Sequence, residues 1–379
     1  MKWHKTCCVV VSINESKMKL TFTFKNQQKK LSMPKLLAIS DHYIPQRYME
    51  EGLASLAEYG VETDVFSWEH ETLEELQEAN LKIELGGPDA VSLPDELHQI
   101  VDQYDMIVTQ FPPIPKRLIE TAKQLKLIGI LRGGVENVDV ETATQRNIAV
   151  FNTPGRNARA VAECTIGLIL AEIRNIAKGH AALKQGIWTR DYPNKSDIPE
   201  LLGKTVGLIG FGAIGRLVAK FLDAFGANII VYDPFYSSDD KNITSVDLEM
   251  LMRMSDIVSI HARYLPETHH LINRELLQMM KPTAVLVNTA RSGLVDEKAL
   301  IEILKMRKIA GAALDVFDNE PLLNDSPFLA LDNVTIVPHL AGSTMDAFRN
   351  SPKLFAANLI RCLQGEKNLP VVNGIVPVF

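Results

Sequence analysis

The sequence contains 379 residues, of which 46% are hydrophobic and 23% are charged, as is typical of a soluble globular protein. Its length predicts two domains rather than one. The formal net charge of −6, together with the lack of basic runs interleaved with aromatic residues, argues against nucleic-acid binding. No apolar run is long enough to cross a bilayer, so we expect no membrane partner.

The N-terminal segment and the cysteines bear on localisation. The 4 cysteines lack the paired spacing of a zinc site or a disulfide framework, so we predict no metal and a reducing, cytoplasmic location. Residues 1–32 are rich in lysine, and we expect a poorly ordered extension with Met33 as the natural start. Their apolar run, 7–11, is too short for the core of a signal peptide. An organelle transit peptide is the alternative, although the segment contains no arginine.

From residue 35 onward, short apolar strands alternate with amphipathic helices. We predict strands at 36–40, 61–68, 105–110, 125–131 and 147–152, and helices at 46–59, 72–79, 95–103, 115–124 and 140–146. This alternation is typical of a parallel sheet covered by helices on both faces. A long apolar helix is predicted at 157–180, and the segment 186–201 is expected to be irregular.

The motif around which the chain is organised lies in residues 205–233. An apolar strand leads into Gly210-x-Gly212-x-x-Gly215, which is followed by an amphipathic helix and a second strand that ends in Asp233. The first glycine permits a sharp turn, the second a close approach of a pyrophosphate, and the third close packing of the helix. The helix N-terminus offers free N–H groups to the phosphates. Asp233 would accept hydrogen bonds from the ribose and repel a 2′-phosphate, which predicts NAD rather than NADP.

The pattern continues after this unit and places three reactive residues at strand ends. We predict strands at 256–262, 284–290, 311–317 and 333–340, and helices at 246–254, 274–280, 297–307 and 345–363. Arg291 and Glu320 follow two of these strands and His339 lies at the end of a third, at the edge where open α/β sheets bind ligands.

These three side chains suit the oxidation of a 2-hydroxy acid and the reverse reduction. An arginine fork can hold the substrate carboxylate and polarise the C2 oxygen. A histidine can exchange a proton with that oxygen near neutral pH. A carboxylate behind the imidazole fixes its tautomer and favours the imidazolium.

At these residues the chain resembles the D-isomer-specific 2-hydroxyacid dehydrogenases, the family of D-lactate, glycerate and phosphoglycerate dehydrogenases. The resemblance runs from residue 33 to the C-terminus, and it is carried by LRGGVENVDV, NTPGRNARAVAE, GLIGFGAIGR, NTARSGLVDEKAL, AGAALDVFDNEP and VPHLAGST. It implies an α/β protein with two doubly wound parallel-sheet domains. These are a Rossmann NAD-binding domain (155–340) and a flavodoxin-like substrate domain (33–154 and 341–379). It also implies a homodimer formed through the long helix and the segment around Trp188.

The resemblance also implies roles for individual residues. Arg291 binds and polarises the substrate, Glu320 pairs with the imidazole, and His339 is the acid/base. The substrate carboxylate is expected at Arg132 and the backbone of Gly133, Gly134 and Val135, in addition to Arg291. The cofactor is expected at Gly210, Gly212, Ala213, Ile214, Gly215, Asp233, Thr289, Ala290, Asp315, His339 and Gly342, with Asp315 at the nicotinamide carboxamide.

Other interpretations stay open. Arg291 could be a surface cation, Glu320 a turn residue, His339 a core histidine and Asp315 a cap, and His261, His269 or His270 could be the base instead. Arg263 replaces a proline that is usual in the family and could meet a polar substrate or solvent.

The expected substrate is a glycerate/hydroxypyruvate or sugar-acid pair. D-3-phosphoglycerate is the alternative, but phosphoglycerate dehydrogenases usually carry Arg-Ser where residues 109–112 read TQFP. A third hypothesis is an NADH-sensing binding protein of the corepressor type.

Overall fold

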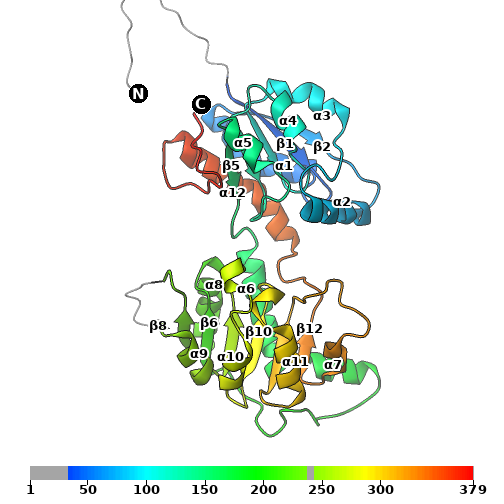
Figure 1. Ribbon diagram of the computed structural model, residues 1–379, viewed down its shortest axis with the longest axis vertical. Coiled ribbons are helices and arrows are strands. Elements are labelled where there is room, and N and C mark those ends of the chain that lie inside the picture. Colours follow the sequence, from blue (N-terminus) through cyan, green and yellow to red (C-terminus); the bar gives the residue numbers. More distant parts are fainter. Residues whose placement is uncertain (1–32, 237–242, 379) are drawn as a thin grey trace, which may run out of the picture.

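The computed structural model describes residues 33–236 and 243–378, and these residues form two lobes (Figure 1). The first lobe is built on a sheet of five parallel strands in the order β2-β1-β3-β4-β5. Its strands are β1 (Lys35–Ser40), β2 (Glu62–Ser67), β3 (Met106–Thr109), β4 (Leu127–Ile130) and β5 (Ala149–Asn152). The expectation for residues 1–32 lies outside the described residues.

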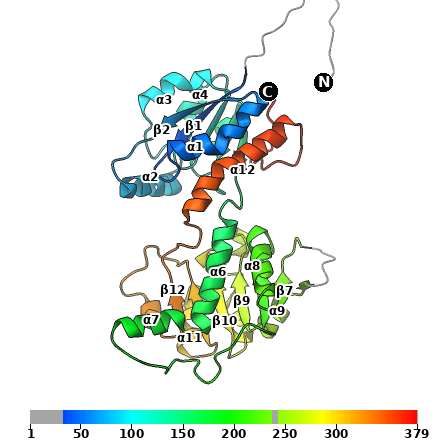
Figure 2. The same ribbon diagram turned by 180° about the vertical axis from the view of Figure 1, so that it is seen from behind.

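Helices cover both faces of this sheet because successive strand residues point to opposite sides. Leu37 and Ile39 of β1 belong to a core shared with α2 (Leu73–Gly86), α3 (Asp95–Ile100), α4 (Lys116–Thr121) and α5 (Val140–Gln145). Leu36 and Ala38 face the opposite core, which α1 (Gln46–Leu53) and α12 (Met345–Leu363) cover. The last helix of the chain therefore packs beside α1 in the first lobe (Figure 2).

The second lobe holds a seven-stranded parallel sheet in the order β12-β11-β10-β9-β6-β7-β8. On one face α6 and α8 pack over it, and on the other α9, α10 and α11 do. The strands are β6 (Thr205–Ile209), β7 (Asn228–Tyr232), β8 (Ile243–Ser245), β9 (Ile257–Ile260), β10 (Val285–Asn288), β11 (Gly311–Leu314) and β12 (Val334–Ile336). The helices are α6 (Ala158–Ile173), α8 (Ala213–Asp223), α9 (Leu248–Met254), α10 (Arg274–Met279) and α11 (Glu297–Lys305).

Both strand orders belong to doubly wound sheets, which confirms the predicted fold class. The order reverses between β1 and β3 in the first sheet, and between β6 and β9 in the second. Ligands bind such sheets outside the carboxyl ends of the strands at the reversal. The domain boundaries stay a prediction.

The expected helix at 157–180 is wrong, because the structure breaks it into α6 and α7 (Ile176–Lys184). Asn175 stands at the break in a left-handed conformation, with φ of 56°, and its side-chain amide donates to Asn194 Oδ1 at 2.7 Å. Apolar periodicity does not reveal a break of this kind, because the side chain that hydrogen-bonds to Asn175 belongs to Asn194, in a loop beyond α7.

Three smaller differences concern element lengths. The helix expected at 46–59 tightens after Leu53 into the 3₁₀ helix Ala54–Tyr59. The helix expected at 72–79 continues to Gly86, where Gly87 ends it with φ of 81°. Strand β8 has no predicted counterpart, because three residues are too few to show an alternating pattern.

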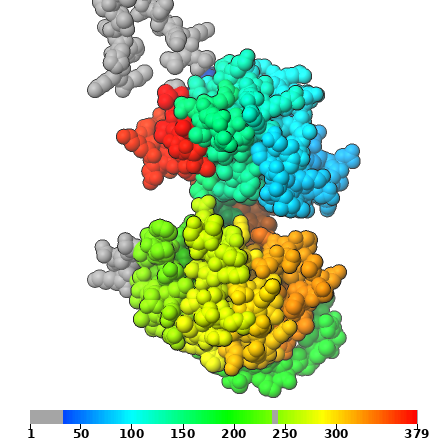
Figure 3. All heavy atoms as spheres, in the orientation of Figure 1, coloured from blue at the N-terminus to red at the C-terminus, as the bar shows by residue number. Residues whose placement is uncertain are grey.

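Two chain segments, 153–157 and 338–344, cross between the lobes, and the molecule narrows there (Figure 3). Arg156, in the segment 153–157, contacts α12. Its guanidinium lies 5.0 Å from the centre of the Phe348 ring and donates to Ser351 Oγ at 3.5 Å. Helix α12 therefore contacts the chain segment that leads into the second lobe.

The contact between β4 and α12 predicts a stability effect. A Cβ atom on Gly129 would lie 2.1 Å from the fully buried Phe355 ring, so Gly129→Ala overpacks the first lobe. We expect a loss of about 1–3 kcal/mol in the free energy of unfolding, measured by urea denaturation.

Gly167→Ala is the matched control, because nothing lies within 4 Å of the added methyl group on α6. Alanine should stabilise that helix by up to about 1 kcal/mol. Equal stability changes in the two variants would contradict the packing of α12 on β4.

Candidate active site

The turn between β6 and α8 has the shape that a dinucleotide requires. Gly210 has φ of 92°, and a Cβ there would lie 2.5 Å from the backbone nitrogen of Ala262. A Cβ on Gly215 would lie 2.3 Å from the carbonyl oxygen of Gly210, so the helix can start close to the strand only with glycine. Gly212 has nothing within 4 Å of its missing Cβ. The open space at Gly212 fits the close approach of a pyrophosphate to the N-terminus of α8.

Asp233 is held beside this turn at the end of β7. Its Oδ2 accepts a hydrogen bond from the Phe211 nitrogen at 2.7 Å, and its Oδ1 accepts one from the Phe235 nitrogen at 2.8 Å. Each carboxylate oxygen keeps a second lone pair. A fixed negative charge at this place can accept hydrogen bonds from ribose hydroxyls and disfavours a 2′-phosphate. These residues fit NAD.

The sheet order brings the three predicted catalytic residues to one edge. Strands β10, β11 and β12 are neighbours, and Arg291, Glu320 and His339 follow their carboxyl ends. His339 Nδ1 lies 2.6 Å from Glu320 Oε2, and Glu320 Oε1 accepts a hydrogen bond from the Phe317 nitrogen at 2.9 Å. The carboxylate thereby orients the imidazole. Within the described residues His339 Nε2 makes no hydrogen bond, so it is available to a ligand.

Arg291 presents an exposed guanidinium on a fixed backbone. Asn288, the last residue of β10, accepts a hydrogen bond from the Ala290 nitrogen at 3.0 Å and donates one to the Arg291 carbonyl at 2.9 Å. The hydroxyl of Thr289 lies 2.9 Å from that of Thr165 on α6. The guanidinium itself donates to the Ala290 carbonyl at 2.7 Å. Its remaining donors can bind an anion.

Asp315 is buried and holds the turn that follows His339. Its carboxylate accepts hydrogen bonds from the Leu340 nitrogen at 2.7 Å and from the Ala341 nitrogen at 3.1 Å. Burial raises the pKa of Asp315 above its ordinary value, and these two hydrogen bonds offset part of the rise. The structure thus gives Asp315 a supporting contact at the loop that carries the imidazole. The predicted contact with nicotinamide stays a prediction.

Gly342, which is also a predicted cofactor-binding residue, lies in the segment 338–344 that crosses between the lobes. A Cβ there would lie 2.3 Å from Asn157 Nδ2, so the chain passes close to the residue that precedes α6.

In the first lobe, Arg132 follows β4 and already has three partners. Its guanidinium donates to Asn80 Oδ1 at 3.1 Å, to Glu84 Oε1 at 2.9 Å and to Glu136 Oε2 at 2.9 Å. Sequence reasoning missed these partners. Asn80 and Glu84 lie on α2, about 50 positions away, and only the spacing of four residues to Glu136 could have suggested a contact.

The alternative histidines have different surroundings. His261 Nε2 lies 2.9 Å from Ser259 Oγ, and its buried Nδ1 has no hydrogen-bond partner. Loss of solvent lowers the pKa of His261 to about 3, so this ring stays neutral near pH 7 and is poorly suited to donate a proton. The rings of His269 and His270 stack at 3.8 Å. Arg263 is exposed.

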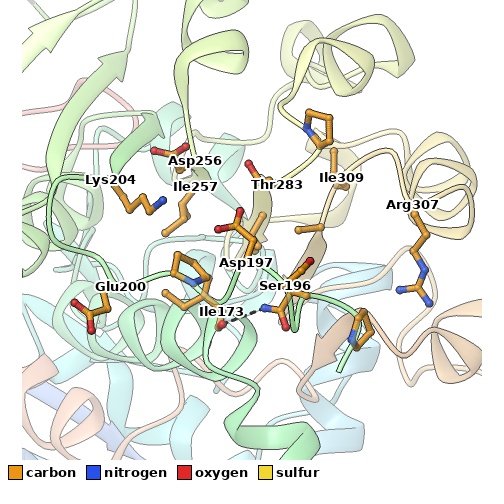
Figure 4. A pocket seen from close by; sticks show the side chains of 16 residues that line it. Ile173, Ser196, Asp197, Glu200, Lys204, Asp256, Ile257, Thr283, Arg307 and Ile309 are labelled. Carbon is orange, nitrogen blue, oxygen red and sulfur yellow. Dashed lines mark hydrogen bonds between the residues drawn. The ribbon is translucent and has the colours of Figure 1, made fainter. Parts of the chain in front are cut away.

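A cavity of about 380 Å³ lies at the opposite edge of the second sheet (Figure 4). Asp197 and Glu200 line it on one side, and the residues at the start of β6, β9 and β10 line it on the other. It contains none of the predicted site residues, so it is separate from the candidate active site. Among residues 33–236 and 243–378 no helix is both long and apolar enough to span a membrane, and no cluster of three metal-ligating side chains occurs.

Comparisons with known proteins identify the family of this chain. Residues 166–341 match the family model described as "D-isomer specific 2-hydroxyacid dehydrogenase, NAD binding domain". The chain is 43% identical over 258 residues to hydroxypyruvate reductase of Thermotoga maritima, covering 67% of this chain and 83% of that protein. It is 42% identical over 281 residues to D-3-phosphoglycerate dehydrogenase of Methanocaldococcus jannaschii, covering 73% of this chain. The match spans only 53% of the latter enzyme.

The solved structure of D-2-hydroxyisocaproate dehydrogenase is also similar. It aligns with a TM-score of 0.70 and 26% identity, covering 90% of this chain and 100% of that one. Together the comparisons confirm the resemblance, the two-domain parallel α/β fold and NAD as the cofactor of residues 166–341.

Proposed function

The chain belongs to the D-isomer-specific 2-hydroxyacid dehydrogenases, and on this premise we propose that it interconverts a D-2-hydroxy acid and its 2-keto acid with NAD(H). The observation that carries the proposal is the 2.6 Å pairing of His339 with Glu320 at the sheet edge that also carries Arg291. A turn residue and a core histidine would have no reason to pair at this edge.

Different residues of the chain are proposed to bind the cofactor and the substrate. The turn at Gly210 and Gly212 would hold the pyrophosphate at the N-terminus of α8, and Asp233 would hold the ribose. When bound, the cofactor supplies or accepts the hydride at C2 of the substrate. Arg291 binds the substrate carboxylate and orients the C2 oxygen.

His339 Nε2 gives a proton to the C2 oxygen in reduction and takes it back in oxidation. The negative Glu320 stabilises the imidazolium that reduction consumes and oxidation produces. Nearby Asp315 keeps the turn after His339 in place.

Two features of the first lobe support our proposal of a small hydroxy acid without a phosphate as the substrate. Arg132, with the backbone of Gly133, Gly134 and Val135, is proposed to complete the substrate-carboxylate site. The charge of Arg132 is already matched by two carboxylates, so its guanidinium would attract a distal phosphate group of the substrate only weakly. Gln110, which follows β3, is fully buried and neutral, and its amide has no partner. We therefore propose a glycerate/hydroxypyruvate or sugar-acid substrate, with D-3-phosphoglycerate as the alternative.

The role of Arg291 can be tested directly. In Arg291→Ala, kcat/KM for hydroxypyruvate reduction should fall about 100-fold or more, because the substrate loses its bidentate anchor. The Kd for NADH, measured by fluorescence, should stay within about twofold. Arg253→Ala, which removes an exposed cation from α9, is the control and should leave both constants unchanged. Undiminished turnover in Arg291→Ala would refute the assignment.

We propose that two chains form a homodimer through α7 and the segment after it. Four large apolar side chains are more than half exposed there: Ile176, Leu183, Ile187 and Trp188, the last with 79% of its surface accessible. An apolar patch of this kind on a single chain marks an interaction surface. A twofold dimer would bury the patch of each chain against the same patch of the other.

Sedimentation tests the dimer. The wild-type protein should sediment at twice the chain mass, and Trp188→Glu should shift it toward the monomer at micromolar concentration. Met306→Glu is the control, because Met306 is similarly exposed at the end of α11. A monomeric wild-type protein would exclude the proposed interface.

We also propose a cytoplasmic location. Both cysteines in the described residues, Cys164 and Cys362, are free thiols, which fits a reducing compartment.

A further inference from the structure

The loop that follows β4 presents free backbone N–H groups beside the guanidinium of Arg132. Its carbonyl groups are already engaged: the Arg132 oxygen by the Thr153 nitrogen at 3.1 Å, and the Gly133 oxygen by Asn152 Nδ2 at 2.6 Å. In the part of the chain that the structure describes, the N–H groups of Gly133, Gly134 and Val135 donate to no protein acceptor. Successive free N–H groups beside a guanidinium attract a negative charge.

A carboxylate of the chain itself lies beside this loop and pairs with Arg132. If Gly134 carried a Cβ, that atom would lie 2.2 Å from Glu136 Oε2 and 2.4 Å from Glu136 Oε1. Glu136 Oε2 also accepts a hydrogen bond from Arg132 Nη2 at 2.9 Å. The side chain therefore folds back over the loop and occupies the space beside Gly134.

Arg132 does not need Glu136 in order to stay in place. Glu84 and Asn80 on α2 hold the other side of its guanidinium, and the ring of Phe111 lies 5.7 Å from it. Two carboxylates around one cation leave one surplus negative charge at the loop. Glu136 is the partner that can leave, because it belongs to the loop itself, whereas Glu84 has a similar exposure but lies on the helix α2.

We propose that Glu136 is an internal competitor for the substrate carboxylate, an inference that rests on the proposed function of this loop. Glu136 pairs with Arg132 and so covers this side of the loop, and an incoming 2-keto acid displaces it from the guanidinium. The exchange replaces one carboxylate by another and leaves the local charge unchanged. The apparent Kd of a substrate then equals the intrinsic Kd divided by the fraction of molecules in which the loop is uncovered.

The test measures binding of oxamate, a stable 2-keto acid analogue, to the enzyme saturated with NADH. Glu136→Ala should lower the Kd of oxamate about three- to tenfold, which corresponds to a loop covered in about 70–90% of molecules. Glu136→Asp keeps the charge but shortens the reach by one methylene, and it should lower the Kd in the same direction. Glu141→Ala, which removes a nearby exposed carboxylate without contact to Arg132, is the control and should bind oxamate as the wild type does.

The outcomes separate this inference from the proposed function. Unchanged or weaker oxamate binding in Glu136→Ala overturns the competitor role. Wild-type affinity in Glu136→Asp together with tighter binding in Glu136→Ala and Glu141→Ala also overturns it, since net charge alone would then be the cause. Turnover of 2-keto acids by the wild-type enzyme is measured first. No turnover rejects the proposed function, whereas turnover with unchanged oxamate binding rejects only the role of Glu136.

Discussion

The hydrogen bond between His339 and Glu320 is the interaction on which the account of this protein depends. It joins the chain after β11 to the chain after β12, and it fixes which imidazole nitrogen faces a ligand. The surroundings reinforce it: Glu320 is held by the Phe317 nitrogen, and the turn after His339 is held by the buried Asp315. A loop alone would leave the imidazole free to rotate, whereas these contacts give it one orientation.

Two arginines in different lobes have contrasting surroundings, and the contrast organises the site. Arg291 has an exposed guanidinium on a rigid turn, so its charge is available to a substrate. The charge of Arg132 is balanced by Glu84 and Glu136, so Arg132 can position a ligand but attracts a further negative charge only weakly. We propose that a substrate with one carboxylate suits this pair better than one that also carries a phosphate. The selectivity we propose thus follows from how the two cations are paired.

Local sequence patterns predicted the features that depend on interactions between residues close together in the sequence. The glycine spacing and Asp233 predicted the dinucleotide turn because each residue has a steric or electrostatic task within about 30 positions. Alternating apolar strands predicted the parallel sheets, and the positions of Arg291, Glu320 and His339 at strand ends predicted a shared edge. Features set by distant contacts were not predictable. The break at Asn175 depends on Asn194, and the environment of Arg132 depends on α2.

The most direct test of the central claim is a crystal structure of the protein with NADH and oxamate. The account predicts Arg291 on the carboxylate of oxamate, His339 Nε2 on its amide-side carbonyl oxygen, and the nicotinamide ring against the same molecule. Oxamate bound elsewhere, or an imidazole turned away from it with Glu320 unpaired, would contradict the account.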